Sequence, residues 1–291
     1  MPIEPPVVSP ATIADAYAAL AGGTPDAPVR PIAGGTDLMV TLAGDLGDPP
    51  ARIVDLWGLE ALRGIVVDGT ALSLGALTTF TEIRHSALCR EHLPVLVEAA
   101  ASIGAAQIQN RGTLGGNIAN ASPAGDTLPV LLAVDARFVL GSVRGEREVP
   151  AKAFWTGYRR TAMAPDELVL KIVIPLLQDR RASFRKVGTR RAQSISKVVM
   201  AVAWRSDAID GSGPWHDVRV ALGSVAPTPI RASRTEAVLE GAAPTADVAD
   251  AAADALAGEL VPIDDVRSTA GYRRLAAARI LHRCIREAGG W

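Results

Sequence analysis

Cysteine is nearly missing from this chain of 291 residues, which contains only Cys89 and Cys284. The two lie far apart and form no Cys-x-x-Cys motif, so thiolates cannot assemble a zinc site or an iron–sulfur cluster here. An isolated cysteine is most often a small apolar core residue, and we expect both to be buried. The four histidines show no metal-ligand spacing with a cysteine, so the sequence predicts no metal site.

An excess of one charge and long apolar runs are missing too. Thirty Lys and Arg residues against 31 Asp and Glu give a net charge of −1, which argues against nucleic-acid binding through charge. No apolar run reaches the roughly 18 residues that a membrane helix needs. The start, Met1-Pro2-Ile3-Glu4, lacks the basic and apolar stretches of a secretory signal, so we expect a cytoplasmic protein without a membrane span.

The chain does have enough apolar sequence for more than one core. Hydrophobic residues make up 48% of it, and its length exceeds the usual size of one domain, so two or three domains are expected. Residues 1–56 predict a small α/β unit. Ile13, Ala16, Tyr17 and Leu20 have helical spacing, Ser9-Pro10 could start that helix, and apolar runs at 29–33 and 53–56 are typical of strands.

Residues 57–176 predict a second α/β unit. Asp68-Gly69 between two alternating runs indicates a hairpin, because Asp-Gly accepts the positive φ of a tight turn. The other elements expected here are helices at 81–84, 93–103 and 128–133, strands at 136–140 and 147–149, and a buried strand at 168–174.

A polar break within residues 175–182 marks the boundary of the last unit, residues 177–291. Strands at 183–187, 198–204 and 218–225 predict a three-stranded antiparallel sheet. Helical patterns at 234–240, 245–257 and 271–288 predict a helical layer on it. In the last helix we expect an apolar stripe of Leu275, Ala278, Leu281, Ile285 and Ala288, with the arginines, Arg273 included, facing solvent or another subunit.

Two glycine-rich segments are the best candidates for binding chemistry. Residues 111–126 contain Thr113-Leu114-Gly115-Gly116-Asn117, and their glycines and proline make a continuous helix unexpected. Residues 31–38 contain Ala33-Gly34-Gly35-Thr36-Asp37. Bare backbone N–H groups beside hydroxyls can bind a phosphate, so the two segments could close on one pyrophosphate. Each could also be a tight turn inside a packed domain, because a single glycine loop is a weak signal.

Together these segments resemble the FAD-binding subunit of molybdenum hydroxylases, the family of xanthine dehydrogenase and carbon monoxide dehydrogenase. Residues 157–175, 184–198 and 220–229 match the family in the same order, so the resemblance covers nearly the whole chain. It implies an α+β fold, in which a FAD-binding fold of two α/β subdomains (PCMH-type) precedes the C-terminal sheet and helices. It also implies an oxidoreductase subunit that takes part in electron transfer.

The resemblance further implies partners and cofactors outside this chain. In the family, a large subunit hydroxylates the substrate at a molybdenum–pterin cofactor, and two 2Fe–2S clusters in a small subunit pass electrons to FAD and on to an external acceptor. A heterotrimer or a dimer of heterotrimers is expected, with a purine, another N-heterocycle or an aldehyde as substrate. The alternatives are a stand-alone FAD-dependent oxidase or reductase of the same superfamily and an interaction subunit that has lost the cofactor.

The site residues follow from the same resemblance. Asp126 would contact the adenosine ribose region, although a helix cap would also explain it. Lys186 would lie near the flavin, where a cation stabilises a reduced, anionic ring, although it could be an exposed strand lysine. No residue of this chain is expected to be catalytic or to bind a metal. The set expected to bind FAD is Pro31, Ile32, Ala33, Gly34, Gly35, Thr36, Asp37, Leu38, Ile103, Thr113, Leu114, Gly115, Gly116, Asn117, Asp126, Val169 and Lys186.

Overall fold

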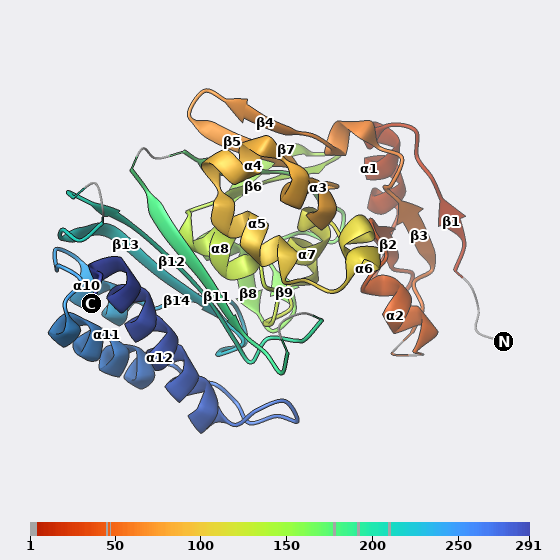
Figure 1. Ribbon diagram of the computed structural model, residues 1–291. Helices are drawn as coiled ribbons and strands as arrows, with labels where there is room; N and C mark the ends of the chain where they lie inside the picture. The colour runs from red at the N-terminus through yellow and green to blue at the C-terminus, as the bar shows by residue number, and fades with distance from the viewer. Residues whose placement is uncertain (1–4, 45, 47, 177–178, 191–192, 209–210) are drawn as a thin grey trace.

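The computed structural model describes residues 5–44, 46, 48–176, 179–190, 193–208 and 211–291, and it shows an α+β architecture (Figure 1). Residues 177 and 178, where the predicted break between the second and third units lies, are outside that set. Among the described residues, none of the helices combines the length and apolarity that crossing a bilayer requires.

A small parallel sheet begins the chain, in the order β1-β3-β2. Because β2 and β3 are parallel and pair Ile32 with Asp55, both strands end at the same edge. The predicted start of the first helix is wrong: Thr12, and not Ser9-Pro10, caps it by accepting the Asp15 N–H. The elements are β1 (Val7–Val8), α1 (Ile13–Ala21), β2 (Val29–Ile32), α2 (Leu38–Ala43) and β3 (Arg52–Asp55).

The second unit is built on a five-stranded antiparallel sheet in the order β4-β5-β10-β6-β7. The predicted Asp-Gly hairpin is confirmed, with Gly69 at a φ of 58°. Helices between β5 and β6 cover the sheet (Figure 1). The strands are β4 (Ile65–Asp68), β5 (Ala71–Gly75), β6 (Arg137–Ser142), β7 (Gly145–Pro150) and β10 (Leu168–Pro175), with the small hairpin β8 (Trp155–Gly157) and β9 (Arg160–Thr161). The helices are η1 (Glu60–Leu62), α3 (Phe80–His85), α4 (Ala87–His92), α5 (Pro94–Ala101), α6 (Ala106–Arg111), α7 (Leu114–Asn120), α8 (Leu128–Ala133) and α9 (Ala151–Phe154).

The third unit contains the three predicted antiparallel strands and a short fourth strand that the sequence pattern did not show. Its order is β11-β12-β13-β14, and β14 has only two residues, too few for an alternating pattern. In Figure 1 the blue helices cover one face of this sheet, and α8 packs on β12 and β13. The elements are β11 (Arg181–Val187), β12 (Val198–Ser206), β13 (Trp215–Gly223), β14 (Ile230–Arg231), α10 (Ser233–Leu239), α11 (Ala246–Glu259) and α12 (Ala270–Gly289).

The predicted orientation of α12 is wrong at its start. Leu275 is 50% exposed, whereas Arg273 is 3% exposed. Arg273 is buried because its guanidinium donates to the carbonyl oxygens of Lys197 and Ser224, at 2.9 and 2.7 Å, and pairs with Asp265 at 2.8 Å. A charge whose terminal donors reach acceptors can occupy a core position, although the Nε of Arg273 is buried and has no hydrogen-bond partner among the described residues.

The apolar cores run across the units. The largest core joins α5, α7 and α8 to Phe184, Val199 and Ala201 of the C-terminal sheet. A second core joins α1 and β3 to Leu168 and Leu170 of β10. The third lies between the C-terminal sheet and its helices. The two cysteines are buried and free, as expected.

Candidate cofactor site

The first glycine segment leaves the carboxyl edge of the parallel sheet, directly after β2. Gly35 has a φ of 76°, which favours glycine because it lacks a Cβ. The backbone N–H groups of Gly34, Gly35, Thr36 and Asp37, and the Thr36 hydroxyl, make no hydrogen bond with another described residue. Residues 32–36 are half-buried, so these donors line the protein surface without a partner of their own.

The second glycine segment is a helix, and the expectation of an irregular loop is wrong for residues 114–120. Thr113 caps α7 because its Oγ1 accepts the Gly116 N–H at 3.1 Å. The next donors are also used: the N–H groups of Leu114 and Gly115 donate to the Thr78 and Ala76 carbonyl oxygens, both at 2.9 Å. The expected set of free loop N–H groups is therefore absent from residues 114–117, whose Asn117 N–H donates to Thr113.

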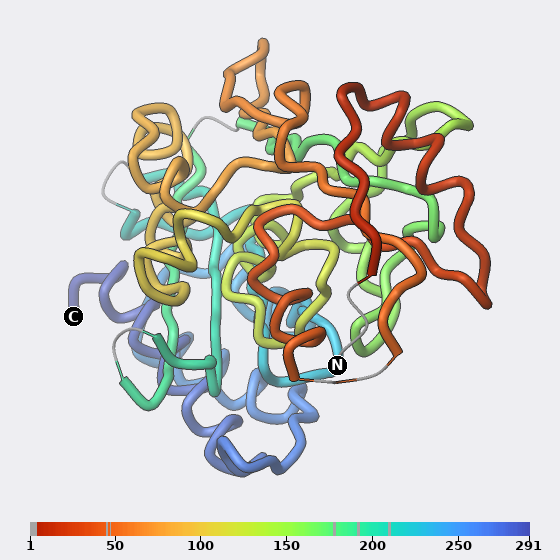
Figure 2. Tube along the Cα trace, turned by 90° about the vertical axis from the view of Figure 1, so that its right-hand side faces the viewer, coloured from red at the N-terminus to blue at the C-terminus, as the bar shows by residue number. Residues whose placement is uncertain are grey.

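The structure brings the two glycine segments together. An ideal Cβ placed on Gly34 would lie 1.7 Å from the carbonyl oxygen of Arg111, so the two backbones touch. The Asn120 side-chain amide donates to Asp37 Oδ1 at 2.9 Å, which ties the end of α7 to the first segment. In Figure 2 the red-orange chain around α2 lies beside the yellow-green chain around α7. The two segments are therefore neighbours in the folded chain.

Asp126 and Lys186 form a buried ion pair with each other. Lys186 Nζ lies 2.5 Å from Asp126 Oδ2 and also donates to the Ser102 carbonyl oxygen at 3.0 Å. Both side chains are under 10% exposed. Neither simple alternative holds: Asp126 caps no helix, since Thr127 precedes α8, and Lys186 is not an exposed strand lysine.

The Asp126 carboxylate has one oxygen to spare. Its Oδ1 is buried and has no hydrogen-bond partner among the described residues. Burial raises the pKa of Asp126, and the charge and hydrogen bond of Lys186 oppose that rise. An unpartnered buried acceptor costs free energy, so this oxygen suits a ligand hydroxyl.

The remaining expected residues divide between surface and core. Ile103 is half-buried and packs on the edge of the largest core, next to Ser102. Leu114 and Val169 are members of that core, and α7 packs on β10, which carries Val169. Gly115 serves packing as well, because a Cβ there would lie 2.6 Å from the Ala76 Cβ.

Several polar residues at this site carried no signal in the sequence. Asn120 connects Asp37 to the hairpin of β8 and β9, since its Oδ1 accepts a hydrogen bond from Arg159 at 2.9 Å. Trp57, which follows β3, has the Arg111 guanidinium carbon 3.8 Å from its ring centroid. Such pairs are distant in sequence, and no spacing rule predicts them.

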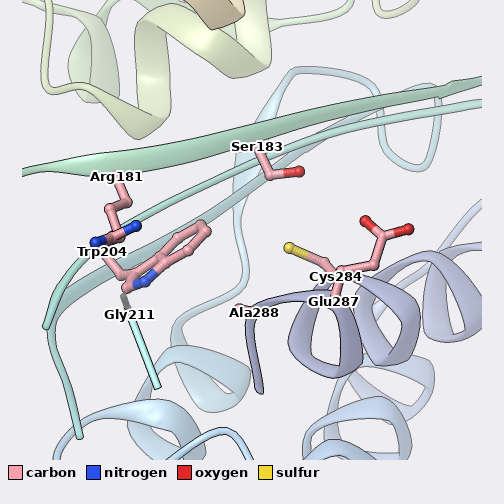
Figure 3. Close-up of a pocket in the computed structure, with 7 residues that line it drawn as sticks. All are labelled: Arg181, Ser183, Trp204, Gly211, Cys284, Glu287 and Ala288. Atoms are coloured by element: carbon pink, nitrogen blue, oxygen red, sulfur yellow. The ribbon is translucent and has the colours of Figure 1, made fainter. Parts of the chain in front are cut away.

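Two hollows lie elsewhere, around α12. One, of about 270 Å³, lies between β11, β12 and α12, where Figure 3 shows Cys284 and Glu287 near Ser183 and Trp204. Burial raises the pKa of the Cys284 thiol to about 11, so it is not a reactive thiolate. The other, of about 260 Å³, is lined by Val187, Tyr272 and Ile280, among others. Both are below the roughly 300–1,000 Å³ of typical ligand pockets. We place the candidate site at the glycine segments, which carry the unpartnered N–H groups of residues 34–37.

The residues at the glycine segments fit a dinucleotide. Gly34 lets two backbones meet, the N–H groups that follow it can donate to a diphosphate, and Asp126 Oδ1 can accept from a ribose hydroxyl. Among the described residues, no group of three or more His, Cys, Asp or Glu side chains is close enough to hold a metal ion.

Sequence comparison decides the family. The family described as "FAD binding domain in molybdopterin dehydrogenase" matches residues 2–177, and the "CO dehydrogenase flavoprotein C-terminal domain" matches residues 183–288. The chain belongs to the FAD-binding subunits of the molybdopterin dehydrogenase family. FAD as its cofactor and its class, an oxidoreductase subunit, are thereby confirmed.

Individual members of this family match nearly the whole chain in sequence. The putative xanthine dehydrogenase FAD-binding subunit of Escherichia coli K12 is 32% identical over 288 residues, with 96% of each chain covered. The carbon monoxide dehydrogenase medium chain of Hydrogenophaga pseudoflava is 32% identical over 280 residues, covering 96% of this chain and 95% of that one. The structure of carbon monoxide dehydrogenase from the same organism, in a form that lacks the Mo-pyranopterin moiety, has a TM-score of 0.91 at 31% identity, covering 97% and 96%.

Proposed function

We propose that this chain is the electron-transfer subunit of a multi-subunit molybdenum hydroxylase, in which FAD relays electrons from 2Fe–2S clusters of a partner subunit to an external acceptor. Family membership supports the proposal. The observation that carries it is the contact between Gly34 and Arg111, which joins the two glycine segments beside a row of unpartnered N–H groups.

The proposed FAD surround consists of residues 31–38 and 113–117 with Ile103, Asp126, Val169 and Lys186. The first segment donates its N–H groups and the Thr36 hydroxyl to the diphosphate. The second segment forms part of the wall of the site and donates no N–H group, because the N–H groups of residues 114–117 are bonded within the protein. Lys186 orients the Asp126 carboxylate, whose free Oδ1 accepts from the adenosine ribose; because Lys186 contacts Asp126, this proposal places it at the ribose and not near the flavin, where the resemblance had put it. Leu114 and Val169 support the site from the core.

The chemistry assigned to this chain is binding and orientation. Bound FAD supplies a store for two electrons that can be filled and emptied singly. The protein holds the cofactor with neutral donors and one shielded ion pair, so no side chain needs to form or break a bond. We therefore propose no catalytic residue in this chain.

The partners in this proposal are a large subunit with the molybdenum–pterin cofactor and a small subunit with the two 2Fe–2S clusters, assembled as a heterotrimer or a dimer of heterotrimers in the cytoplasm. The substrate class is a purine, another N-heterocycle or an aldehyde, and the xanthine dehydrogenase relative supports the first. We also propose three units, residues 1–56, 57–176 and 177–291, because each has its own sheet.

Purification of the complex from its native source tests this function. We expect the chain to co-purify with two other polypeptides, with molybdenum and iron by metal analysis, and with one FAD per chain by absorbance. Turnover of an organic substrate by the isolated chain would favour a stand-alone flavin enzyme instead. A colourless chain that takes up no FAD would refute both enzymatic functions.

A further inference from the structure

An arginine lies on a tryptophan ring where the two glycine segments meet. Trp57 lies two residues after the end of β3. Its backbone N–H donates to Asp55 Oδ1 at 2.9 Å, which holds it in place. The Arg111 guanidinium carbon is 3.8 Å from the Trp57 ring centroid. Since Asp55 pairs with Ile32, this stack is beside the point where β2 ends and the first glycine segment begins.

The backbone of Arg111 contacts the same segment. Gly34 has its Cα so close to the Arg111 carbonyl that no Cβ could fit between them. The main chain of Arg111 therefore forms part of the contact between the two glycine segments, which we call the junction. The ring of Trp57 packs on the Arg111 guanidinium and sets its position. In parallel sheets, ligands bind at the carboxyl edge of the strands, which is the edge occupied by this stack.

The charge of Arg111 is not compensated within the described part of the chain, where it forms no ion pair. A second arginine adds to it: the Arg63 guanidinium carbon is 4.7 Å from the same ring centroid, and Arg63 Nη2 donates to the Trp57 carbonyl oxygen. Two carboxylates lie nearby: Asp55, whose Oδ1 accepts the backbone N–H of Trp57, and Glu60, which is 3.6 Å from Arg63 and whose side chain is 87% exposed. Two guanidinium groups therefore share one ring, and among the described residues only that of Arg63 forms an ion pair.

Stacking on Trp57 leaves the N–H donors of the Arg111 guanidinium available for hydrogen bonds. A guanidinium that packs face-on against an aromatic ring uses its π face, and its N–H donors remain free in the plane. Those donors match phosphate oxygens in a fork geometry, and the stacked side chain has little conformational entropy left to lose on binding. The N–H groups of residues 34–37 provide only partial charges, whereas a diphosphate carries two full negative charges.

We propose that Arg111, held in place by Trp57, binds the diphosphate of FAD and supplies the positive charge that the backbone donors cannot. This assignment rests on the proposed function, and it adds a charged residue to a site otherwise built from neutral donors. Trp57 acts as a positioning residue, because it restricts Arg111 without contacting the ligand.

The affinity of the full-length apoprotein for FAD, measured by flavin fluorescence between about 50 and 500 mM salt, tests the proposal. We expect Arg111→Met to raise the Kd for FAD roughly ten- to hundred-fold and to flatten its dependence on salt, because one charge-assisted contact is lost. Arg111→Lys keeps the charge without the fork, so its Kd should be intermediate and its salt dependence close to that of the wild type.

Arg52→Met is the matched control, since Arg52 begins β3 at the opposite edge of the same sheet and is exposed. It should leave the Kd and its salt dependence unchanged. Should Arg111→Met fail to fold by circular dichroism, Arg111→Gln takes its place.

An unchanged Kd in folded Arg111→Met or Arg111→Gln, or a weaker Kd with unchanged salt dependence in either of them, would overturn the role of Arg111. Both outcomes differ from failure of the proposed function, in which the wild-type chain itself binds no FAD.

Discussion

The two glycine segments resemble each other in sequence but differ in how the fold uses their backbone. After β2, the N–H groups of residues 34–37 have no partner among the described residues. In α7, the N–H groups of residues 114–117 all have partners: Thr78, Ala76 and, for Gly116 and Asn117, Thr113 itself. The first segment can therefore donate to a ligand, and the second has its donors committed to the protein.

This difference explains why each segment needs glycine. Gly34 permits contact with the Arg111 backbone, and Gly35 adopts a positive φ, so both shape the segment whose N–H groups have no partner among the described residues. Gly115 instead allows α7 to pack on Ala76. A Gly-Gly pair thus indicates close approach to another part of the chain, and the surrounding fold decides whether the neighbouring N–H groups keep a donor to spare.

The largest effect is expected from Gly34→Ala. The new Cβ would overlap the Arg111 carbonyl oxygen, so the junction must open, at a cost of about 3 kcal/mol or roughly a hundred-fold in FAD affinity. Gly58→Ala is the control, because a Cβ there meets nothing within 4 Å. Titration with FAD measures the Kd of both variants. An unchanged Kd for Gly34→Ala would show that FAD does not bind at this junction.

The ion pair beyond the second segment should separate stability from binding. Asp126→Asn leaves the Lys186 charge buried without its partner and should lower the free energy of unfolding by about 3 kcal/mol. In the double variant Asp126→Leu with Lys186→Met, most of that stability should return, while FAD affinity stays weak because the Oδ1 acceptor is gone. Denaturation and FAD titration of all variants check this. Restored affinity in the double variant would exclude the carboxylate from the site.

A smaller pair of effects compares one threonine from each segment. Thr113→Val removes the cap of α7 and should lower the free energy of unfolding by about 1 kcal/mol, with little change in the Kd for FAD. Thr36→Val should do the reverse, because its hydroxyl has no partner in the described protein. Urea denaturation measures the stability of both variants, and titration measures their Kd for FAD. Equal changes of both quantities in the two variants would contradict the comparison.

The smallest effect concerns Glu167, a buried carboxylate outside both segments. The hydrogen bond from Arg147 lowers the pKa of Glu167, the opposite of the direction found at Asp126. Glu167 therefore stabilises the fold above its unfolded pKa of about 4.3, and that contribution is lost as the pH falls through the lower, folded value. Glu167→Gln should be less stable than the wild type by about 0.5 kcal/mol at pH 7, and this difference should shrink as the pH falls below the unfolded pKa of Glu167. Urea denaturation over a pH series measures the difference, and a difference that does not change with pH would assign the effect to packing.

Local patterns predicted most elements of the fold, because their causes lie within a few residues. The Asp68-Gly69 hairpin and the C-terminal helices follow from turn chemistry and periodicity. Helix α7 escaped prediction because its glycines conceal a Thr113 cap and its support by Ala76 and Thr78 is distant in sequence. Arg273 escaped because its acceptors, the Lys197 and Ser224 carbonyls, come from other strands.

The candidate site was predictable to the level of motifs and no further. The glycine segments could be named from their chemistry, and their contact through Gly34 agrees with that expectation. The sequence could not show which donors were already used, that Lys186 pairs with Asp126, or that Arg111 lies on Trp57. Each depends on residues that meet only in the folded chain.

The position of Lys186 on β11 has a consequence for biosynthesis. Asp126 precedes it by 60 residues, and the strand that carries Lys186 is held by a sheet that continues to β14. A nascent chain that has emerged only as far as β10 contains both glycine segments but leaves the Asp126 carboxylate without its cation. With the FAD surround proposed above, loading of the flavin requires translation of β11, and we expect a chain terminated before Lys186 to bind FAD more weakly than the full-length chain.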